Sequence, residues 1–140
     1  MNRRIRGEIG QSLLEYTLVL PVFVVLVLGV IEFGLLYFQY NSVTNAAREG
    51  ARTGIVMATA ACPLSCLEDE VEAAALAIAV GLDPDFVDVD VDWPESTNGI
   101  PQVSVRVAYR TSYITRMLIE AAGGNGEITL ESTATMQREY

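Results

Sequence analysis

The chain contains one run of apolar residues that is long enough to cross a membrane. Residues 16–38 are almost entirely apolar, and a helix of this length measures roughly 34 Å, enough to span the hydrocarbon core of a bilayer. Two residues interrupt the run. Pro21 lacks the N–H group that a helix interior uses, so we expect a bend or a local unwinding there. Glu32 is expected at the outer headgroups, where a carboxylate needs no protein partner; contact with another subunit is the alternative.

The helical pattern continues past the apolar run to about residue 60. Gly50 and Gly54 lie four residues apart on one stripe of this extension, where another backbone can approach closely. A glycine inside a helix costs about 1 kcal/mol relative to alanine, so two on one stripe indicate a packing contact. We expect the stripe to hold the sheet of the chain's own domain, and a contact between subunits is the alternative.

A second, shorter helix is predicted after residue 64. Ser65 and Glu68 have the spacing of a capping box, and a cluster of acids around Glu68 suits the positive end of a helix dipole. The apolar positions recur at helical spacing and define one face that should be buried: Leu67, Val71, Ala74, Ala75 and Ile78. Gly81 is expected to end this helix.

The C-terminal half of the chain alternates between apolar and polar residues, which predicts β-strands. Apolar residues take one face of segments 87–93, 103–109 and 128–136, and a short helix is expected over residues 111–122. Three antiparallel strands packed on the outer half of the long helix, with the second helix at an end or edge, give an α+β fold.

The polar face of the first strand carries three acids: Asp88, Asp90 and Asp92. We expect Arg106 and Arg110 of the next strand to face these acids across a hairpin. A calcium site is not expected, because alternate side chains on a strand lie roughly 6.8 Å apart and do not converge on one ion.

Cys62 and Cys66 are the only cysteines. In an exported domain a closely spaced pair most simply forms a disulfide, here a small ring between the two helices. Zinc is not expected, because a tetrahedral site would need two more cysteines or histidines. A reactive thiol is not expected either, since no histidine or lysine is present to lower the pKa of either thiol.

Acids outnumber bases by 18 to 9, every base is an arginine, and histidine is absent. This charge makes a nucleic-acid surface improbable. Without histidine or lysine, general-base or nucleophilic chemistry would rest on carboxylates alone, so we expect no enzyme activity and no cofactor. Three arginines precede the apolar run, which predicts a cytoplasmic N-terminus and an acidic domain outside: Arg3, Arg4 and Arg6.

Gly10 precedes Gln11, and Glu15 and Tyr16 stand at the start of the apolar run, as in the processing site of type IV prepilins. The stretches EYTLVLP, GVIEFG and AAREGAR that follow resemble the TadE-like pseudopilins of tight-adherence (Flp) pilus systems. The resemblance is strong over residues 10–54 and weaker beyond, where the ending GEITLESTATM is similar to the last strand of that family.

The resemblance implies that a prepilin peptidase cuts after Gly10 and methylates Gln11. The ammonium group of Gln11 would then meet Glu15 of a neighbouring subunit. This attraction is roughly 4 kcal/mol at about 4 Å and an effective dielectric near 20, before both charges are desolvated. The implied partners are the peptidase, other pilins and pseudopilins, an inner-membrane assembly platform with its ATPase, and the lipid bilayer.

The sequence thus predicts three parts: a cytoplasmic leader over residues 1–10, a long helix over 11–61, and an acidic outer head over 62–140. The expected protein is a pilin-like, single-pass minor pseudopilin of the inner membrane that assists pilus assembly or enters the pilus. An uncleaved membrane protein whose acidic head is a binding adaptor is the alternative. The major filament subunit is a third possibility, although major Flp pilins are usually much shorter.

Overall fold

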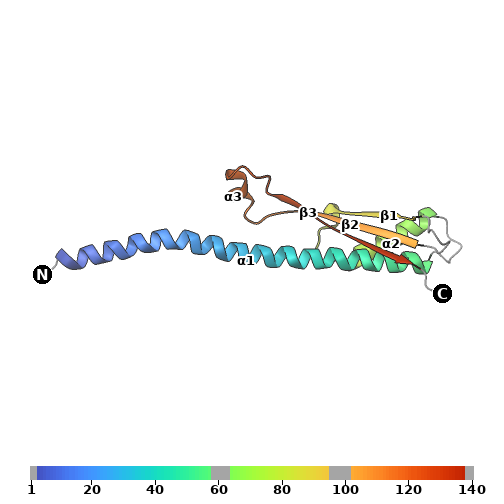
Figure 1. Cartoon of the computed structure of the whole chain (residues 1–140), viewed down its shortest axis with the longest axis horizontal. Coiled ribbons are helices and arrows are strands. Elements are labelled where there is room, and N and C mark those ends of the chain that lie inside the picture. The colour runs from blue at the N-terminus through green and yellow to red at the C-terminus, as the bar shows by residue number, and fades with distance from the viewer. Residues whose placement is uncertain (1–2, 58–63, 95–101, 138–140) are drawn as a thin grey trace.

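The computed structural model describes residues 3–57, 64–94 and 102–137. The elements follow one another as α1 (Arg3–Met57), α2 (Leu64–Ile78), the 3₁₀ turn η1 (Pro84–Phe86), β1 (Val87–Asp92), β2 (Gln102–Ser112), α3 (Arg116–Ala121) and β3 (Glu127–Gln137). The long N-terminal helix, the second helix and the three-stranded sheet confirm the predicted α+β fold (Figure 1).

Helix α1 is continuous over 55 residues, and Pro21 lies inside it. The predicted local unwinding is therefore absent, and Figure 1 shows only a gentle curve along the helix. One turn earlier, the hydroxyl of Thr17 donates a hydrogen bond to the carbonyl oxygen of Leu13 at 2.7 Å. Among the described residues, α1 is the one helix long and apolar enough to cross a membrane.

The sheet is an antiparallel meander in the order β1-β2-β3. Its register pairs Val89 with Val107, and Val107 with Ser132, so the apolar positions of all three strands share one face. That face packs on the C-terminal half of α1, while α2 lies beside α1 and reaches β1. The alternation of the sequence therefore predicted which side of each strand is buried.

The core lies between the two long helices and the inner face of the sheet. Its buried residues come from α1, α2, the turn before β1, and the central strand: Val43, Ala46, Ala47, Ala51, Val71, Ala75, Leu82, Val103, Val105, Val107 and Tyr109. Helix α1 is thus one wall of the head, and the head has no separate core of its own.

Several predicted boundaries were wrong. Helix α2 begins at Leu64, so Ser65 lies inside it, and no acid lies in its first turn. Ile78 is 43% exposed and does not join the buried face of α2. Strand β2 extends to Ser112, which shortens the following helix to Arg116–Ala121.

Gly50 and Gly54 face the head, in contact distance of the sheet and of α2. A Cβ atom at Gly50 would lie 3.1 Å from Val105 Cγ1, and one at Gly54 would lie 3.1 Å from Val103 Cγ2. Both distances are tighter than ordinary van der Waals contact, so the two glycines let α1 approach the central strand closely.

We predict that Gly50→Leu lowers the free energy of unfolding of the head by about 1–3 kcal/mol relative to Gly34→Leu. Gly34 is the matched control because a Cβ atom there would meet nothing within 4 Å. Both substitutions raise the helix propensity by the same amount. The difference between their free energies of unfolding therefore isolates the cost of packing at Gly50. Trp93, the single tryptophan, reports thermal unfolding by its fluorescence in detergent micelles. Equal midpoints for the two variants would contradict this packing.

Candidate functional site

The head leaves most of the first half of α1 exposed where its side chains are described. From residue 13 to residue 31 every side chain is exposed except that of Leu28, which is half-buried. We call residues 13–31 the free stalk. A helix surface that is apolar on all sides suits a lipid environment.

The predicted assembly residues Glu15 and Tyr16 lie at the start of this free stalk, and the processing residues Gly10 and Gln11 lie just before it. The backbone helix runs without a break through Gly10 and Gln11. Gln11 and Glu15 are one helical turn apart on the same face, and both side chains are exposed. Tyr16 is likewise exposed. The head reaches none of these residues, so their outward faces are open to another chain.

The head meets the stalk first at Glu32. Its carboxyl group accepts a hydrogen bond from the Thr115 hydroxyl at 2.6 Å and another from the Thr115 backbone N–H at 3.3 Å. Glu32 is only 9% exposed. The expectation of an interfacial acid without a protein partner was therefore wrong, and the partner belongs to the same chain.

Glu32 is the first of several polar residues along the face of α1 that the head covers. Gln39 is buried two turns later, and Ser42 donates a hydrogen bond to the carbonyl oxygen of Val80 at 2.9 Å. At the same level Gly81, at a φ of 78°, lies against the ring of Phe38, where a Cβ atom would come within 2.8 Å of the ring. Glu32, near the end of the apolar run, and Gln39 and Ser42, just after it, thus face protein instead of lipid.

Thr115 belongs to a protruding connection between β2 and β3. We call residues 113–126, which include α3, the α3 lobe. Its neck is closed by a hydrogen bond from the Tyr113 N–H to the carbonyl oxygen of Gly126 at 3.1 Å. Figure 1 shows the lobe reaching from the sheet toward the N-terminal half of α1.

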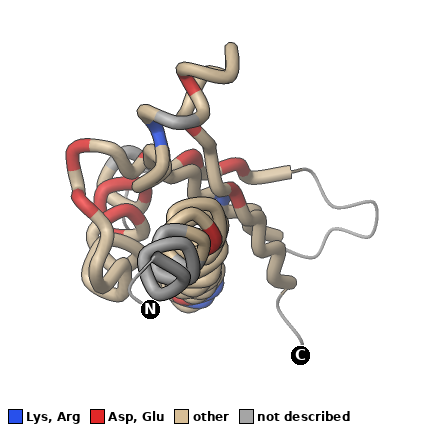
Figure 2. The backbone as a smooth tube through the Cα atoms, turned by 90° about the vertical axis from the view of Figure 1, so that its left-hand side faces the viewer, with Lys and Arg blue, Asp and Glu red and all other residues tan. Residues whose placement is uncertain are grey.

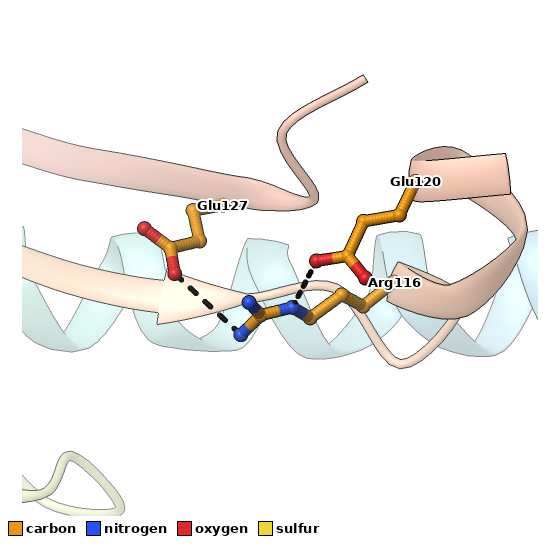
Figure 3. A network of polar contacts seen from close by, with 3 residues as sticks. All are labelled: Arg116, Glu120 and Glu127. Atoms are coloured by element: carbon orange, nitrogen blue, oxygen red, sulfur yellow. Dashed lines mark hydrogen bonds and ion pairs between the residues drawn. The ribbon is translucent and has the colours of Figure 1, made fainter. Parts of the chain in front are cut away.

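Arg116 ties the α3 lobe to the start of β3. Its Nε donates to Glu120 at 2.6 Å, and its guanidinium lies 3.5 Å from Glu127 (Figure 3). The hydrogen bond from Arg116 to Glu120, the charge of Glu120 and then that of Glu127 raise the pKa of the Arg116 side chain. The stem of Arg116 also packs on Gly126, where a Cβ atom would lie 2.7 Å from Arg116 Cγ.

The prediction that Arg106 faces the acids of β1 is confirmed, but its ion pair and the position of Arg110 differ from the expected pairing. Arg106 lies opposite Asp90, yet its ion pair is with Glu131 of β3, at 2.5 Å. The hydrogen bond and charge of Glu131, followed by the charges of Asp90 and Asp88, raise the pKa of the Arg106 guanidinium. Arg110 lies beyond the last pair of the β1–β2 ladder, so its predicted pairing with the β1 acids was wrong.

Cys66 is disulfide-bonded. Cys62, the only other cysteine in the sequence, lies outside the described residues, so the Cys62–Cys66 pairing stays a prediction. Within the described ranges, no three carboxylate or cysteine side chains come close enough together to hold a metal ion.

Residues 10–52 match the family of TadE-like proteins. This segment of the chain is TadE-like. The TadE-like segment covers the free stalk, Glu15, Glu32 and Gly50, and it ends where α1 lies under the sheet. None of the curated proteins and none of the solved structures matches the chain.

The TadE-like segment and the long apolar helix together fit a membrane-anchored component of a tight-adherence pilus system. The α3 lobe and the sheet lie outside the matched segment. Sequence reasoning missed Thr115, because a lone threonine in the turn before a short helix carries no signal. A signal did exist on α1: Glu32, Gln39 and Ser42 recur at helical spacing at the end of the apolar run and just after it.

We predict that Thr115→Val loosens the α3 lobe, because the variant leaves the carboxyl group of Glu32 without its hydroxyl partner. Hydrogen bonds to such a group contribute about 1.5–3 kcal/mol, so a double-mutant cycle with Glu32→Ala should give a coupling of about 1–3 kcal/mol. Hydrogen exchange at the lobe amides is the direct measurement. Thr115→Ser keeps the hydroxyl and is the control. Equal exchange rates in the valine and serine variants would refute the contact.

Proposed function

We propose that the chain is a minor pseudopilin, processed at Gly10 and anchored in the inner membrane, that assists assembly of a tight-adherence pilus. The main support for the proposal is that the TadE-like segment contains the free stalk, whose side chains are exposed and, apart from Glu15, almost all apolar. Such a surface needs either lipid or the helices of other pilins around it. A pseudopilin meets both in turn, since it begins in the bilayer and is drawn into a helical assembly.

The membrane span in this proposal is the free stalk. Its 19 residues from 13 to 31 measure about 28 Å, close to the thickness of the hydrocarbon core. The span is therefore shorter than residues 16–38, because the head already covers one face of α1 at Glu32. Exposed aromatic residues follow at the outer end, as in the aromatic belts of membrane helices: Phe33, Tyr37 and Tyr40.

Assembly in this proposal depends on Glu15. After removal of residues 1–10, the new ammonium group lies on Gln11, one turn from Glu15. Within one chain both groups point outward, so each is free to meet the opposite charge of a neighbouring subunit. Pairing in a low-dielectric helix bundle would set the axial register between subunits.

The acidic head supports a second candidate, an uncleaved membrane protein whose outer domain binds a partner. Figure 2, which looks along α1, shows acidic residues spread over the head and few basic ones. This candidate needs neither a cut after Gly10 nor a role for Glu15.

The test combines two variants in cells that make the pilus. Gly10→Val should leave the chain uncut and still inserted, because the free stalk is unchanged. Glu15→Gln should be cut and folded normally yet fail to enter the assembly, because a neighbour's ammonium group would lose its partner at a cost of several kcal/mol. The mature N-terminus by mass spectrometry, co-purified pilins and pilus yield are the readouts.

Glu72→Gln is the matched control, since Glu72 is an exposed acid on the head. An N-terminus at Met1 in piliated cells would favour the adaptor. If the Glu15→Gln variant is cut correctly and the cells still make normal pili, Glu15 has no role in assembly.

A further inference from the structure

The α3 lobe exposes apolar side chains that the head does not use. Met117 is 85% exposed and Ile114 is 56% exposed, on either side of Thr115. Both lie outside the core, so packing within the head does not account for them. Two exposed side chains alone do not define a partner, so the position of the lobe along α1 decides what covers them.

The position of the lobe identifies that partner. Thr115 is bonded to Glu32, the residue directly after the free stalk, so the lobe stands level with the outer end of the apolar span. Figure 1 shows α3 lying further along α1 toward its N-terminus than any strand of the sheet. If the free stalk spans the bilayer, Met117 and Ile114 reach the headgroup layer of the outer leaflet.

The charges of the lobe are compatible with this layer. Arg116 is paired with Glu120 and Glu127, so the basic group brings no unpaired charge to the interface. Glu32 is covered by Thr115. The lobe thus combines exposed apolar side chains, Met117 and Ile114, with polar groups that are already hydrogen-bonded or ion-paired. This combination is compatible with shallow insertion beside a spanning helix.

We propose that the α3 lobe is a second membrane contact, in which Met117 and Ile114 insert into the outer leaflet beside α1. The lobe and the stalk then fix the tilt and rotation of the head relative to the bilayer. Insertion is driven by apolar area and does not require anionic lipid, because the head is acidic and the lobe's arginine is paired. The inference rests on the membrane anchoring in the proposed function and is independent of pilus assembly.

The experiment places an environment-sensitive fluorophore on single added cysteines in the full chain, reconstituted into phosphatidylcholine nanodiscs. The sites are Met117→Cys in the lobe, Val25→Cys in the free stalk, and Thr133→Cys on the exposed side of β3. Labelling without reductant spares the disulfide-bonded Cys66, and the unsubstituted chain measures any background. Nitroxide lipids carry the quencher either near the headgroup or deep in the acyl chains.

The label at Met117→Cys should shift to the blue and lose most of its emission to the shallow quencher. The label at Val25→Cys should respond to the deep quencher, and that at Thr133→Cys to neither. Adding phosphatidylserine should not strengthen the Met117→Cys response. A quenched Val25→Cys with an unquenched Met117→Cys would overturn the lobe contact and leave the anchoring intact. An unquenched Val25→Cys would overturn both.

A neighbouring copy of the chain is the competing occupant of this surface. A comparison of nanodiscs that hold one chain with nanodiscs that hold two chains distinguishes lipid from a second copy. Lipid quenching at Met117→Cys that is the same in both supports the membrane contact. A blue shift that arises only with two chains, without lipid quenching, would assign the surface to a second copy and refute the proposal.

Discussion

The structure depends on one helix, α1, that lies in two different environments. Its free stalk is exposed, and its C-terminal half packs against the head. From residue 16 to residue 31 helix α1 is almost entirely apolar and exposed, and from Glu32 to Gly54 it presents one face to the head while its other faces stay exposed. The change occurs within the apolar run, where composition gives little sign of it. The carboxyl group of Glu32 would be costly in hydrocarbon, and its two hydrogen bonds with Thr115 mark the point where protein begins to replace lipid.

The head in turn needs this helix in order to fold. A three-stranded sheet has one apolar face to cover, and α2 reaches only the β1 side of it. Val43, Ala47 and Ala51 of α1 supply the rest of the wall, and Gly50 and Gly54 set its distance from the central strand. The C-terminal half of α1 and the head are therefore one folding unit. Helix α1 runs from the free stalk into the head without a hinge among the described residues. A force on the free stalk is therefore transmitted to the head.

Local patterns predicted the elements well and the long-range contacts poorly. The alternation over residues 87–93, 103–109 and 128–136 predicted all three strands and their buried faces, since a half-covered sheet imposes a period of two. The contact between Glu32 and Thr115 joins residues 83 apart in sequence, and no periodicity reports such a pair. The meander puts β3 on the other side of β2, where Glu131 lies diagonally across from Arg106 and pairs with it, and strand order was not readable from the sequence.

The central claim is that the head is held rigidly beside the outer end of the membrane helix. The most direct test is the distance between spin labels at Val30, on the free stalk, and Ile114, in the α3 lobe, measured by pulsed electron paramagnetic resonance in nanodiscs. Both side chains are exposed, so labelling should not disturb the packing. A rigidly held head gives a single, short and narrow distance distribution, which broadens when Thr115 is replaced by valine. A broad distribution in the otherwise unaltered chain would contradict it.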